Sequence, residues 1–432
     1  TEIYTLSLHD ALPISLQRVI MSNLPTAGMT RRLFLRRAAA CAGVAAAMPN
    51  FIESSVLGNA TSAAANDRIT MGVIGLGGRG QHVTQVFMSN KDVQFVAACD
   101  VQKSSRERGK AIIDEKNGNS DCATYIDFRE LLDRKDIDAV LIATGDNWHS
   151  LASIMAARAG KDMYCEKPMS VALTESREVV KTMARYGRVY QCGTQRRNID
   201  NFRLAAGFVH QGMLGKLHTI HAETSEGFVD TYDTVLEAEP EPPREEMAWD
   251  LWLGPALWRP YNRNTPTRGF WSAHQDFSGG SITEWGTHTV DLCQWANESD
   301  DTLPLEYWPE GDQIHARYAN GVKLVLRRSF GQGSCAVRYE GEEGWVETDD
   351  SGKVVVEPAH LLGGQVFPGG YSPANHVREF LDCVHSRGVP TSNAEVAHRA
   401  ISVCHVANIC RRLGRPVKFD PTTERFVNDP EA

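Results

Sequence analysis

Residues 69–80 read ITMGVIGLGGRG, a short apolar run that leads directly into a glycine-rich turn. If the apolar run is a buried strand, Gly75 permits a tight turn and Gly77 lets the backbone approach a pyrophosphate. Gly80 then allows the following helix to pack closely on the strand. The N-terminal amides of such a helix attract phosphate groups. The stretch therefore predicts a dinucleotide site, provided that the surrounding sequence supplies the strands and helices.

The sequence after this turn alternates short apolar runs with amphipathic segments. The runs FVAAC (95–99) and AVLIA (139–143) are almost wholly apolar, as expected for parallel strands that are covered on both faces. Helical patterns occupy residues 80–90 and 104–118. Strands that alternate with helices predict an α/β domain with a doubly wound parallel sheet, here over residues 66–192.

An acidic residue follows the second predicted strand, as the dinucleotide fold requires. Asp100 ends the run VQFVAACD, twenty residues after Gly80. A carboxylate at this place accepts hydrogen bonds from the adenosine ribose and repels a 2′-phosphate, which favours NAD over NADP. Arg79 and Lys103 could still pair with a 2′-phosphate, so NADP stays an alternative.

Polar residues also follow the next two predicted strands, at the sheet edge where ligands bind in open α/β folds. The segment TGDNWHS (144–150) contains His149, for which capping, cofactor positioning and catalysis all stay open. Lys167 follows a buried strand and needs an anionic or hydrogen-bonded partner there. The candidate cofactor residues are Gly75, Gly77, Gly78, Arg79, Gly80, Asp100, Thr144, Asn147, His149, Glu166 and Lys167.

The pattern changes over residues 193–432, which we expect to form an α+β domain with an open, mainly antiparallel sheet. Residues 313–330 read as a hairpin with Asn320-Gly321 at its turn. The alternation within the first strand of this hairpin predicts one packed face and one face available to solvent or a partner subunit. We find no metal-ligand spacing and predict no metal site.

An aromatic-rich segment, residues 247–280, precedes a candidate helix in this second domain. Aromatic rings that cover C–H faces, together with polar groups that hold hydroxyls, suit a sugar site. We assign Trp249 and Trp252 to packing. The candidate substrate residues of this half are Arg268, Trp271 and His274, with Gln195 and Arg196 near the domain junction.

Several separated motifs resemble the Gfo/Idh/MocA oxidoreductases from residue 68 to the C-terminus. They are GLGGRG (75–80), Asp100, the triplet EKP (166–168) and SGGSITEWGTHTVDLCQW (278–295). Later segments, among them WDLWLGPALWRPYN (249–262), resemble an exported bacterial subgroup of this family. The resemblance implies a Rossmann domain, an open-sheet second domain that makes oligomer contacts, and a homodimer or homotetramer.

The resemblance also implies catalytic roles. The lysine of EKP, here Lys167, lies beside the nicotinamide and the reacting sugar carbon in that family. His288 corresponds to the general base of that family. Imidazole suits this role because its unperturbed pKa lies near neutrality. Glu284 stands where the family usually has aspartate, so its part in orienting His288 or holding a substrate hydroxyl is open. Positions 284, 288 and 291 share one face if the segment is a continuous helix, which makes Asp291 a further substrate candidate.

The N-terminal region has two parts that differ from the rest. TEIYTLSLHDALPIS (1–15) resembles translated sequencing-adapter sequence, and we expect residues 1–20 to be a non-native extension with a native start at Met21. Residues 21–65 contain TRRLFLRR (30–37), an alanine-rich apolar run and small-residue sites. These features are typical of a cleaved twin-arginine signal rather than of a membrane span. They predict a periplasmic protein without a membrane anchor.

The charge composition argues against nucleic acid as a binding partner. The 45 basic and 54 acidic residues give a formal charge of −9, and no basic patch is interleaved with aromatic residues. Such a surface does not favour nucleic acid. The ten cysteines are scattered without a CxxC pair, and we predict few or no disulfides.

We therefore expect an exported NAD(P)-dependent oxidoreductase that acts on a CH–OH group of a sugar, polyol or glycoside. Because a dissociated dinucleotide would be lost outside the cytoplasm, the cofactor should stay bound and be recycled. One alternative is NAD-dependent glycoside hydrolysis through transient C3 oxidation and elimination. The other is a sugar- or dinucleotide-binding protein without catalysis.

Overall fold

The computed structural model describes residues 64, 67–224, 234–328, 330–363 and 371–432. The twin arginines Arg31 and Arg32, and the predicted extension 1–20, lie outside the described residues. None of the helices within the described ranges is both long and apolar enough to cross a membrane. Nine cysteines in these ranges are free thiols, and all but Cys383 are buried.

The first half forms the expected parallel sheet of six strands, in the order β3-β2-β1-β4-β5-β6. This is the strand order of dinucleotide-binding folds. The strands are β1 (Ile69–Ile74), β2 (Val93–Cys99), β3 (Ala123–Tyr125), β4 (Ala139–Ile142), β5 (Asp162–Cys165) and β6 (Tyr190–Cys192). The helices of this half are α3 (Gly78–Phe87), α4 (Lys103–Asn117), α5 (Phe128–Leu132), α6 (Asp146–Arg158) and α7 (Leu173–Tyr186). All residues of β4 and β5 are buried. β4 is wholly apolar, as expected for a covered parallel strand, while Asp162 of β5 is buried with Arg387 as its partner.

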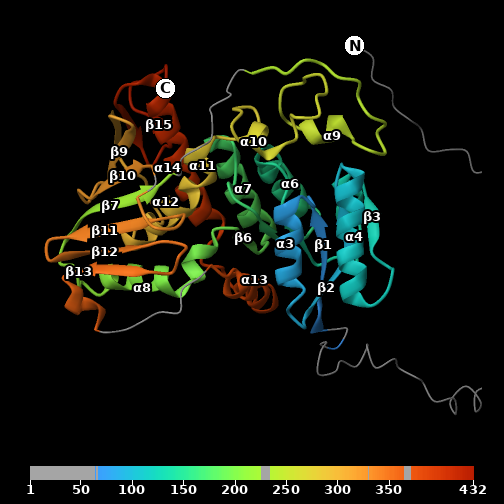
Figure 1. Ribbon diagram of the computed structural model, residues 1–432, viewed down its shortest axis with the longest axis horizontal. Helices are drawn as coiled ribbons and strands as arrows, with labels where there is room; N and C mark the ends of the chain where they lie inside the picture. The colour runs from blue at the N-terminus through green and yellow to red at the C-terminus, as the bar shows by residue number, and fades with distance from the viewer. Residues whose placement is uncertain (1–63, 65–66, 225–233, 329, 364–370) are drawn as a thin grey trace, which may run out of the picture. The chain divides into compact units, whose positions relative to one another are not determined.

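The second half forms one nine-stranded sheet, in the order β13-β12-β11-β7-β10-β9-β8-β14-β15 (Figure 1). Its pairs are antiparallel except β7 with β10, so the sheet is mixed. The strands are β7 (Leu217–Glu223), β8 (Glu306–Glu310), β9 (Gln313–Arg317), β10 (Lys323–Arg327), β11 (Val337–Gly341), β12 (Gly344–Thr348), β13 (Val354–Glu357), β14 (Val417–Asp420) and β15 (Arg425–Phe426). The hairpin β9–β10 turns at Asn320-Gly321 as predicted, with Gly321 at φ +89°.

Several helical segments of the second half contact elements of the first. They are η2 (Gln195–Asn198), α8 (Asp200–His210), α9 (Trp249–Leu253), α10 (Arg268–Trp271), α11 (Ser281–Glu284), α12 (Gly286–Ala296), η3 (Ala359–Leu362), α13 (Ala374–Ser386) and α14 (Ala394–Leu413). Helix α13 lies beside α3, although it comes late in the chain (Figure 1). Its Val377 and Phe380 are buried in the same apolar cluster as Val73 of β1. The first sheet is therefore covered partly by a helix from the second half.

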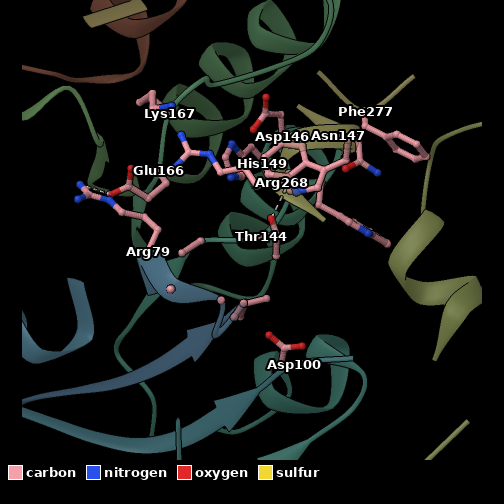
Figure 2. A pocket seen from close by; sticks show the side chains of 18 of the residues that line it. Arg79, Asp100, Thr144, Asp146, Asn147, His149, Glu166, Lys167, Arg268 and Phe277 are labelled. Carbon is pink, nitrogen blue, oxygen red and sulfur yellow. Dashed lines mark hydrogen bonds and ion pairs between the residues drawn. The ribbon is translucent and has the colours of Figure 1, made fainter. Parts of the chain in front are cut away.

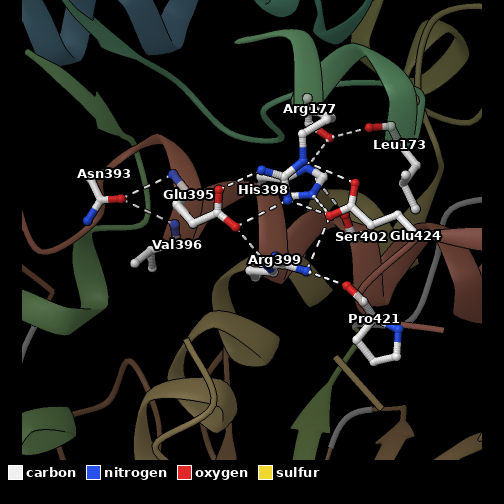
Figure 3. A network of polar contacts seen from close by, with 11 residues as sticks. Leu173, Arg177, Asn393, Glu395, Val396, His398, Arg399, Ser402, Pro421 and Glu424 are labelled. Atoms are coloured by element: carbon white, nitrogen blue, oxygen red, sulfur yellow. Dashed lines mark hydrogen bonds and ion pairs between the residues drawn. The ribbon is translucent and has the colours of Figure 1, made fainter. Parts of the chain in front are cut away.

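A polar network fastens α7 of the first half to α14 and to the β14–β15 hairpin (Figure 3). Arg177 pairs with Glu395 at 2.7 Å and with Glu424. The buried His398 lies 2.8 Å from Glu424 and also contacts Ser176, at 2.8 Å. Because these groups come from both halves and are mutually paired, the network holds the halves in one arrangement.

Candidate active site

A cavity of about 780 Å³ opens at the carboxyl ends of β1, β2, β4 and β5. Loops after these strands form one side, and residues of the second half form the other. Asp100 and Lys167 lie toward opposite ends of the view in Figure 2, with Thr144 between them. This is the sheet edge at which open α/β folds bind their ligands.

The glycine turn has the geometry that its sequence predicts. Gly75 has φ +90°, and a Cβ there would lie 2.5 Å from the Ala143 carbonyl oxygen. A Cβ on Gly80 would lie 2.1 Å from the Gly75 carbonyl oxygen, so only glycine lets α3 pack this close to β1. Gly77 lines the cavity and has open space where a Cβ would be, as does Gly78. That open space is the place at which a pyrophosphate could approach the backbone.

The different surroundings of Gly80 and Gly77 give a matched test of this turn. We expect Gly80→Ala to lower both the melting temperature and the affinity for NAD, because α3 must move away from β1, at a cost of roughly 1–3 kcal/mol. Gly77→Ala should keep the melting temperature and lower only the affinity, since its methyl group would occupy the open space of the cavity. Thermal unfolding and NADH titration of both variants check this. Equal melting temperatures for the two variants would contradict the packing role of Gly80.

Asp100 is oriented by backbone amides. Its Oδ2 accepts a hydrogen bond from Leu76 N at 2.6 Å and its Oδ1 accepts one from Gln102 N at 2.8 Å. Burial raises the pKa of Asp100, while these two amides act to lower it. The side chain lines the cavity. Asp100 is thus held in one orientation at the end of β2, the position that binds a ribose in this fold.

The two cations that could accept a 2′-phosphate are paired with carboxylates. Lys103 lies 2.8 Å from Glu246 at the surface. Arg79 lies 2.9 Å from the buried Glu166, and Figure 2 shows this pair away from Asp100. Both cations that could have paired with a 2′-phosphate are thus engaged by carboxylates in this structure.

Glu166 also accepts a hydrogen bond from Gln195 Nε2, at 3.3 Å, and Gln195 donates to Tyr164 as well. Arg79 further donates to the Tyr371 hydroxyl at 3.2 Å. These contacts place both Arg79 and Gln195 in the cavity wall. Tyr371 was not among the predicted site residues, although it begins the segment YSPANHVREF (371–380).

Lys167 has the anionic partner that its position requires. Its Nζ lies 3.2 Å from Glu284 Oε2, and Arg268 lies 3.3 Å from the same oxygen. Burial alone would raise the pKa of Glu284, but Lys167 lowers it, with smaller contributions from Asp146 and Arg268. Glu284 is therefore an ionised carboxylate that anchors Lys167 at the cavity wall.

A second carboxyl group lies near this pair. Asp146, the first residue of α6, is buried, and burial followed by the charge of Glu284 raises its pKa well above the ordinary value. The neutral form of Asp146 is thus favoured beside the ionised Glu284. Sequence reasoning missed Asp146, although its place at the carboxyl end of β4, before Asn147, could have indicated it.

His288 lines the same cavity and is 5% exposed. Burial, followed by the positive charges of Arg196 and Lys167, lowers its pKa well below the ordinary value. The imidazole is therefore neutral near pH 7, in the form that can accept a proton.

Asn147 and His149 contribute to the cavity mainly through contacts with neighbouring backbone. His149 Nδ1 lies 2.6 Å from the Pro168 carbonyl oxygen. Because a carbonyl only accepts, the proton is on Nδ1, and Nε2 is the acceptor. Asn147 Nδ2 donates to the Leu253 carbonyl oxygen at 3.0 Å. Both residues thus position the first turn of α6 at the cavity.

Arg196 and Trp271 also line the cavity, as predicted for substrate residues. Arg196 pairs with Asp350, with Nε 3.0 Å from Oδ1, and its guanidinium lies 5.0 Å from the Tyr371 ring centroid. Trp252, which we assigned to packing alone, stacks on Trp249 but also lines the cavity. The assignment was incomplete because whether the Trp252 ring faces the cavity is decided by contacts between segments that are far apart in the sequence.

The structure places two predicted substrate residues outside the cavity lining. Asp291 is completely buried and its Oδ2 lies 2.7 Å from Arg197. Burial raises the pKa of Asp291 to about 6, against the effect of Arg197. His274 is buried beside Arg259, with Nε2 2.9 Å from the guanidinium. Both residues therefore stabilise the domain rather than face the cavity.

The expected continuous helix through Glu284, His288 and Asp291 is also wrong. Glu284 ends α11, Trp285 interrupts the helix, and α12 begins at Gly286. Glu284 and His288 both line the cavity, whereas Asp291, on the same helix as His288, pairs with Arg197 in the core.

The cavity residues fit a dinucleotide. The open space above Gly77 and Gly78 can take a pyrophosphate, and the oriented Asp100 carboxylate can take ribose hydroxyls. No group of three or more metal-binding side chains is present among the described residues.

Two family models match almost all of the described chain. The model of the NAD-binding Rossmann fold of the Gfo/Idh/MocA oxidoreductases matches residues 69–194. The model of the C-terminal α/β domain of the same family matches residues 201–432.

Curated relatives match over about a third of the chain. The chain is 27% identical over 150 residues to a 2,7-anhydro-N-acetylneuraminate hydratase of Mediterraneibacter gnavus, covering 35% of this chain and 38% of the relative. It is 30% identical over 166 residues to a glycosyl hydrolase family 109 protein of Shewanella baltica, covering 37% and 35%. It is 26% identical over 152 residues to inositol 2-dehydrogenase of Salmonella typhimurium, covering 35% and 44%. The chain thus aligns with less than half the length of each of these relatives.

Solved structures share the fold over most of the chain. The myo-inositol 2-dehydrogenase of Lactobacillus plantarum superposes with a TM-score of 0.58 at 18% identity, covering 82% of this chain and 100% of that one. The aldose-aldose oxidoreductase of Caulobacter crescentus gives 0.59 at 17% identity, with the same coverage. The two domain matches, the strand order and the glycine turn agree, and the chain belongs to the Gfo/Idh/MocA oxidoreductase family.

Proposed function

We propose that this protein is an NAD-dependent oxidoreductase that acts on a CH–OH group of a sugar, polyol or glycoside. The observation that carries the proposal is the meeting of Lys167, Glu284 and His288 in the cavity that also contains the glycine turn and Asp100. NAD is preferred to NADP because Arg79 and Lys103 are both engaged by carboxylates. When bound, the dinucleotide would supply the hydride acceptor and donor.

The residues of the chain do the proton chemistry and the positioning. Lys167, held by Glu284, donates a hydrogen bond to the oxygen of the reacting carbon. His288 is neutral and takes the hydroxyl proton. Because the charges of Arg196 and Lys167 disfavour the protonated imidazole, this proton is readily given back. Arg196, Arg268 and Trp271 line the cavity where sugar hydroxyls and C–H faces would lie.

Net hydrolysis of a glycoside through transient C3 oxidation and elimination is the second candidate function. The names of two relatives, a hydratase and a glycosyl hydrolase family 109 protein, support it because neither name describes net oxidation. The ready return of the proton by His288 is consistent with a cycle that ends without net redox change. The third possibility is a sugar- or dinucleotide-binding protein without catalysis. The presence of both Lys167 and His288 in the cavity counts against it.

We further propose that the protein is exported by the twin-arginine pathway, that it retains its cofactor, and that it forms a homodimer or homotetramer. The sequence TRRLFLRR (30–37) supports export, and the family resemblance supports an oligomer.

Product analysis distinguishes the candidate functions. We expect purified protein to release a nucleotide with the mass of NAD on denaturation, and to turn over sugars or glycosides without added NAD. A free reducing sugar with no oxidised product, measured by mass spectrometry, indicates hydrolysis. A polyol and a lactone in equal amounts indicate transfer between two sugars. Retained NAD without turnover of any sugar or glycoside would contradict the enzymatic proposal.

A further inference from the structure

Residues 245–253, which we call the strap, cross the loop after β2 although they belong to the second half of the chain. Met247, Trp249 and Leu253 of the strap are buried in one apolar cluster with Phe277. The Trp249 and Trp252 rings stack with their centroids 5.0 Å apart. The strap is therefore a packed element of the fold.

Backbone hydrogen bonds join the strap to the residues that follow Asp100. Ala248 N donates to the Val101 carbonyl oxygen at 3.0 Å, and Lys103 N donates to the Glu246 carbonyl oxygen at 3.0 Å. Gln102 and Met247 form an antiparallel β-bridge between these two bonds. The strap thus pairs, like a short strand, with the loop that carries Asp100.

Side chains from the start of α6 hold the other end of the strap. Trp148 Nε1 donates to the Leu251 carbonyl oxygen at 2.8 Å, and Asn147 Nδ2 donates to the Leu253 carbonyl oxygen at 3.0 Å. A Cβ on Gly254 would lie 2.2 Å from the Trp148 ring, so glycine is needed for this close packing. The strap is therefore attached on both sides of the cavity.

The strap faces the end of the cavity at which Asp100 lies. Its Met247, Leu251 and Trp252 line the cavity. Apolar residues from the loops after β2 and β3 line the same cavity, namely Val101, Ile126 and Phe128. Apolar and aromatic surfaces of this kind suit a flat heterocyclic ring. In this fold, the adenosine of a dinucleotide lies beside the acidic residue that follows β2.

We propose that the strap is the outer wall of the adenosine subsite, and that it must separate from residues 101–103 before a bound dinucleotide leaves. The inference rests on the proposed function, in that it requires a dinucleotide in this cavity. It gives a physical reason for retention of the cofactor, because release requires the two backbone hydrogen bonds of this β-bridge to break.

Ala248→Pro tests the wall directly. Ala248 has φ −80°, which proline can adopt, while the substitution removes the N–H that donates to Val101. We expect NADH release to be about five-fold faster than in the wild type, since one hydrogen bond is lost. NADH is loaded onto the protein, and its fluorescence is followed after mixing with excess NAD. Arg263→Ala is the matched control, because it removes an exposed ion pair with Glu239 that lies outside the strap and should leave the release rate unchanged.

A removable crosslink gives a second test that does not depend on the proline variant. Gln102 and Met247 are bridge partners, so their Cα atoms are at a separation that a disulfide can span. In the Gln102→Cys/Met247→Cys protein, we expect NADH release to be at least ten-fold slower when oxidised than when reduced. Equal release rates in the oxidised and reduced forms would overturn the strap inference while the proposed function stands. Failure of wild-type protein to bind NADH at all would overturn the proposed function instead.

Discussion

Replacement of His288 by alanine is expected to lower kcat by roughly 10²–10⁴-fold, because the variant lacks the group that takes the hydroxyl proton. Bound nucleotide should be retained, since the glycine turn and Asp100 hold it independently of His288. The measurement is turnover of a substrate identified for the wild type, together with the nucleotide content of the purified variant. The exposed His218 offers a control, and His218→Ala should keep wild-type turnover. Nearly full activity of the His288→Ala protein would exclude His288 as the base.

The dependence of kcat/KM on pH should also reflect the protonation of His288. Burial, followed by the charges of Arg196 and Lys167, lowers the pKa of His288, so the acid limb of kcat/KM should lie below about pH 6.5, the ordinary value for histidine. The direction in which the free energy of unfolding changes with pH follows from the difference in proton uptake between the folded and unfolded chains. The unfolded chain takes up a proton below about pH 6.5 while the buried imidazole stays neutral. The contribution of His288 to stability is therefore fully present above that pH and declines as the pH falls toward the folded pKa.

Replacement of Lys167 by methionine is expected to lower kcat by about 10²–10³-fold, the range seen when one hydrogen-bond donor to a reacting oxygen is removed. The substitution also leaves Glu284 buried with only the largely exposed Arg268 as a cationic partner. We therefore expect a lower melting temperature as well. Steady-state kinetics and thermal unfolding measure the two effects separately.

A double variant separates the loss of chemistry from the loss of stability. Lys167→Met/Glu284→Gln removes both charges of the buried pair, so it should regain much of the melting temperature without regaining turnover. Lys181→Met, which changes an exposed lysine on α7, should resemble the wild type in both measurements. Turnover above a tenth of the wild-type value in Lys167→Met would show that Lys167 does not contact the reacting oxygen.

The first domain could be predicted because its signals are local. Gly75 and Gly80 follow an apolar run, and each is required by backbone atoms within the same strand–turn–helix unit or the adjoining β4 loop. Asp100 ends a strand whose apolar character is visible in the sequence. The hairpin at Asn320-Gly321 was predicted for the same reason, since a positive φ at Gly321 is a property of the turn itself.

The residues that the prediction misplaced depend on packing between distant segments. Asp291 was expected to face the substrate because its spacing from His288 is helical, but the buried Arg197 attracts its carboxylate into the core. Trp252 was assigned to packing, yet the path of the strap exposes it to the cavity. Neither outcome can be inferred from periodicity, because the partner residues lie elsewhere in the sequence.

The sequence by itself determined the alternation of strands and helices in the first domain and the cofactor turn, since each depends on neighbouring residues, while the family resemblance pointed to Lys167 and His288. Only the tertiary structure decided that Glu284 pairs with Lys167, that α13 packs on the first sheet, and that the strap pairs with the loop that follows Asp100. These contacts join segments far apart in the chain. They form because burial requires each apolar face and each charge to find a partner, and the sequence does not state which distant partner that is.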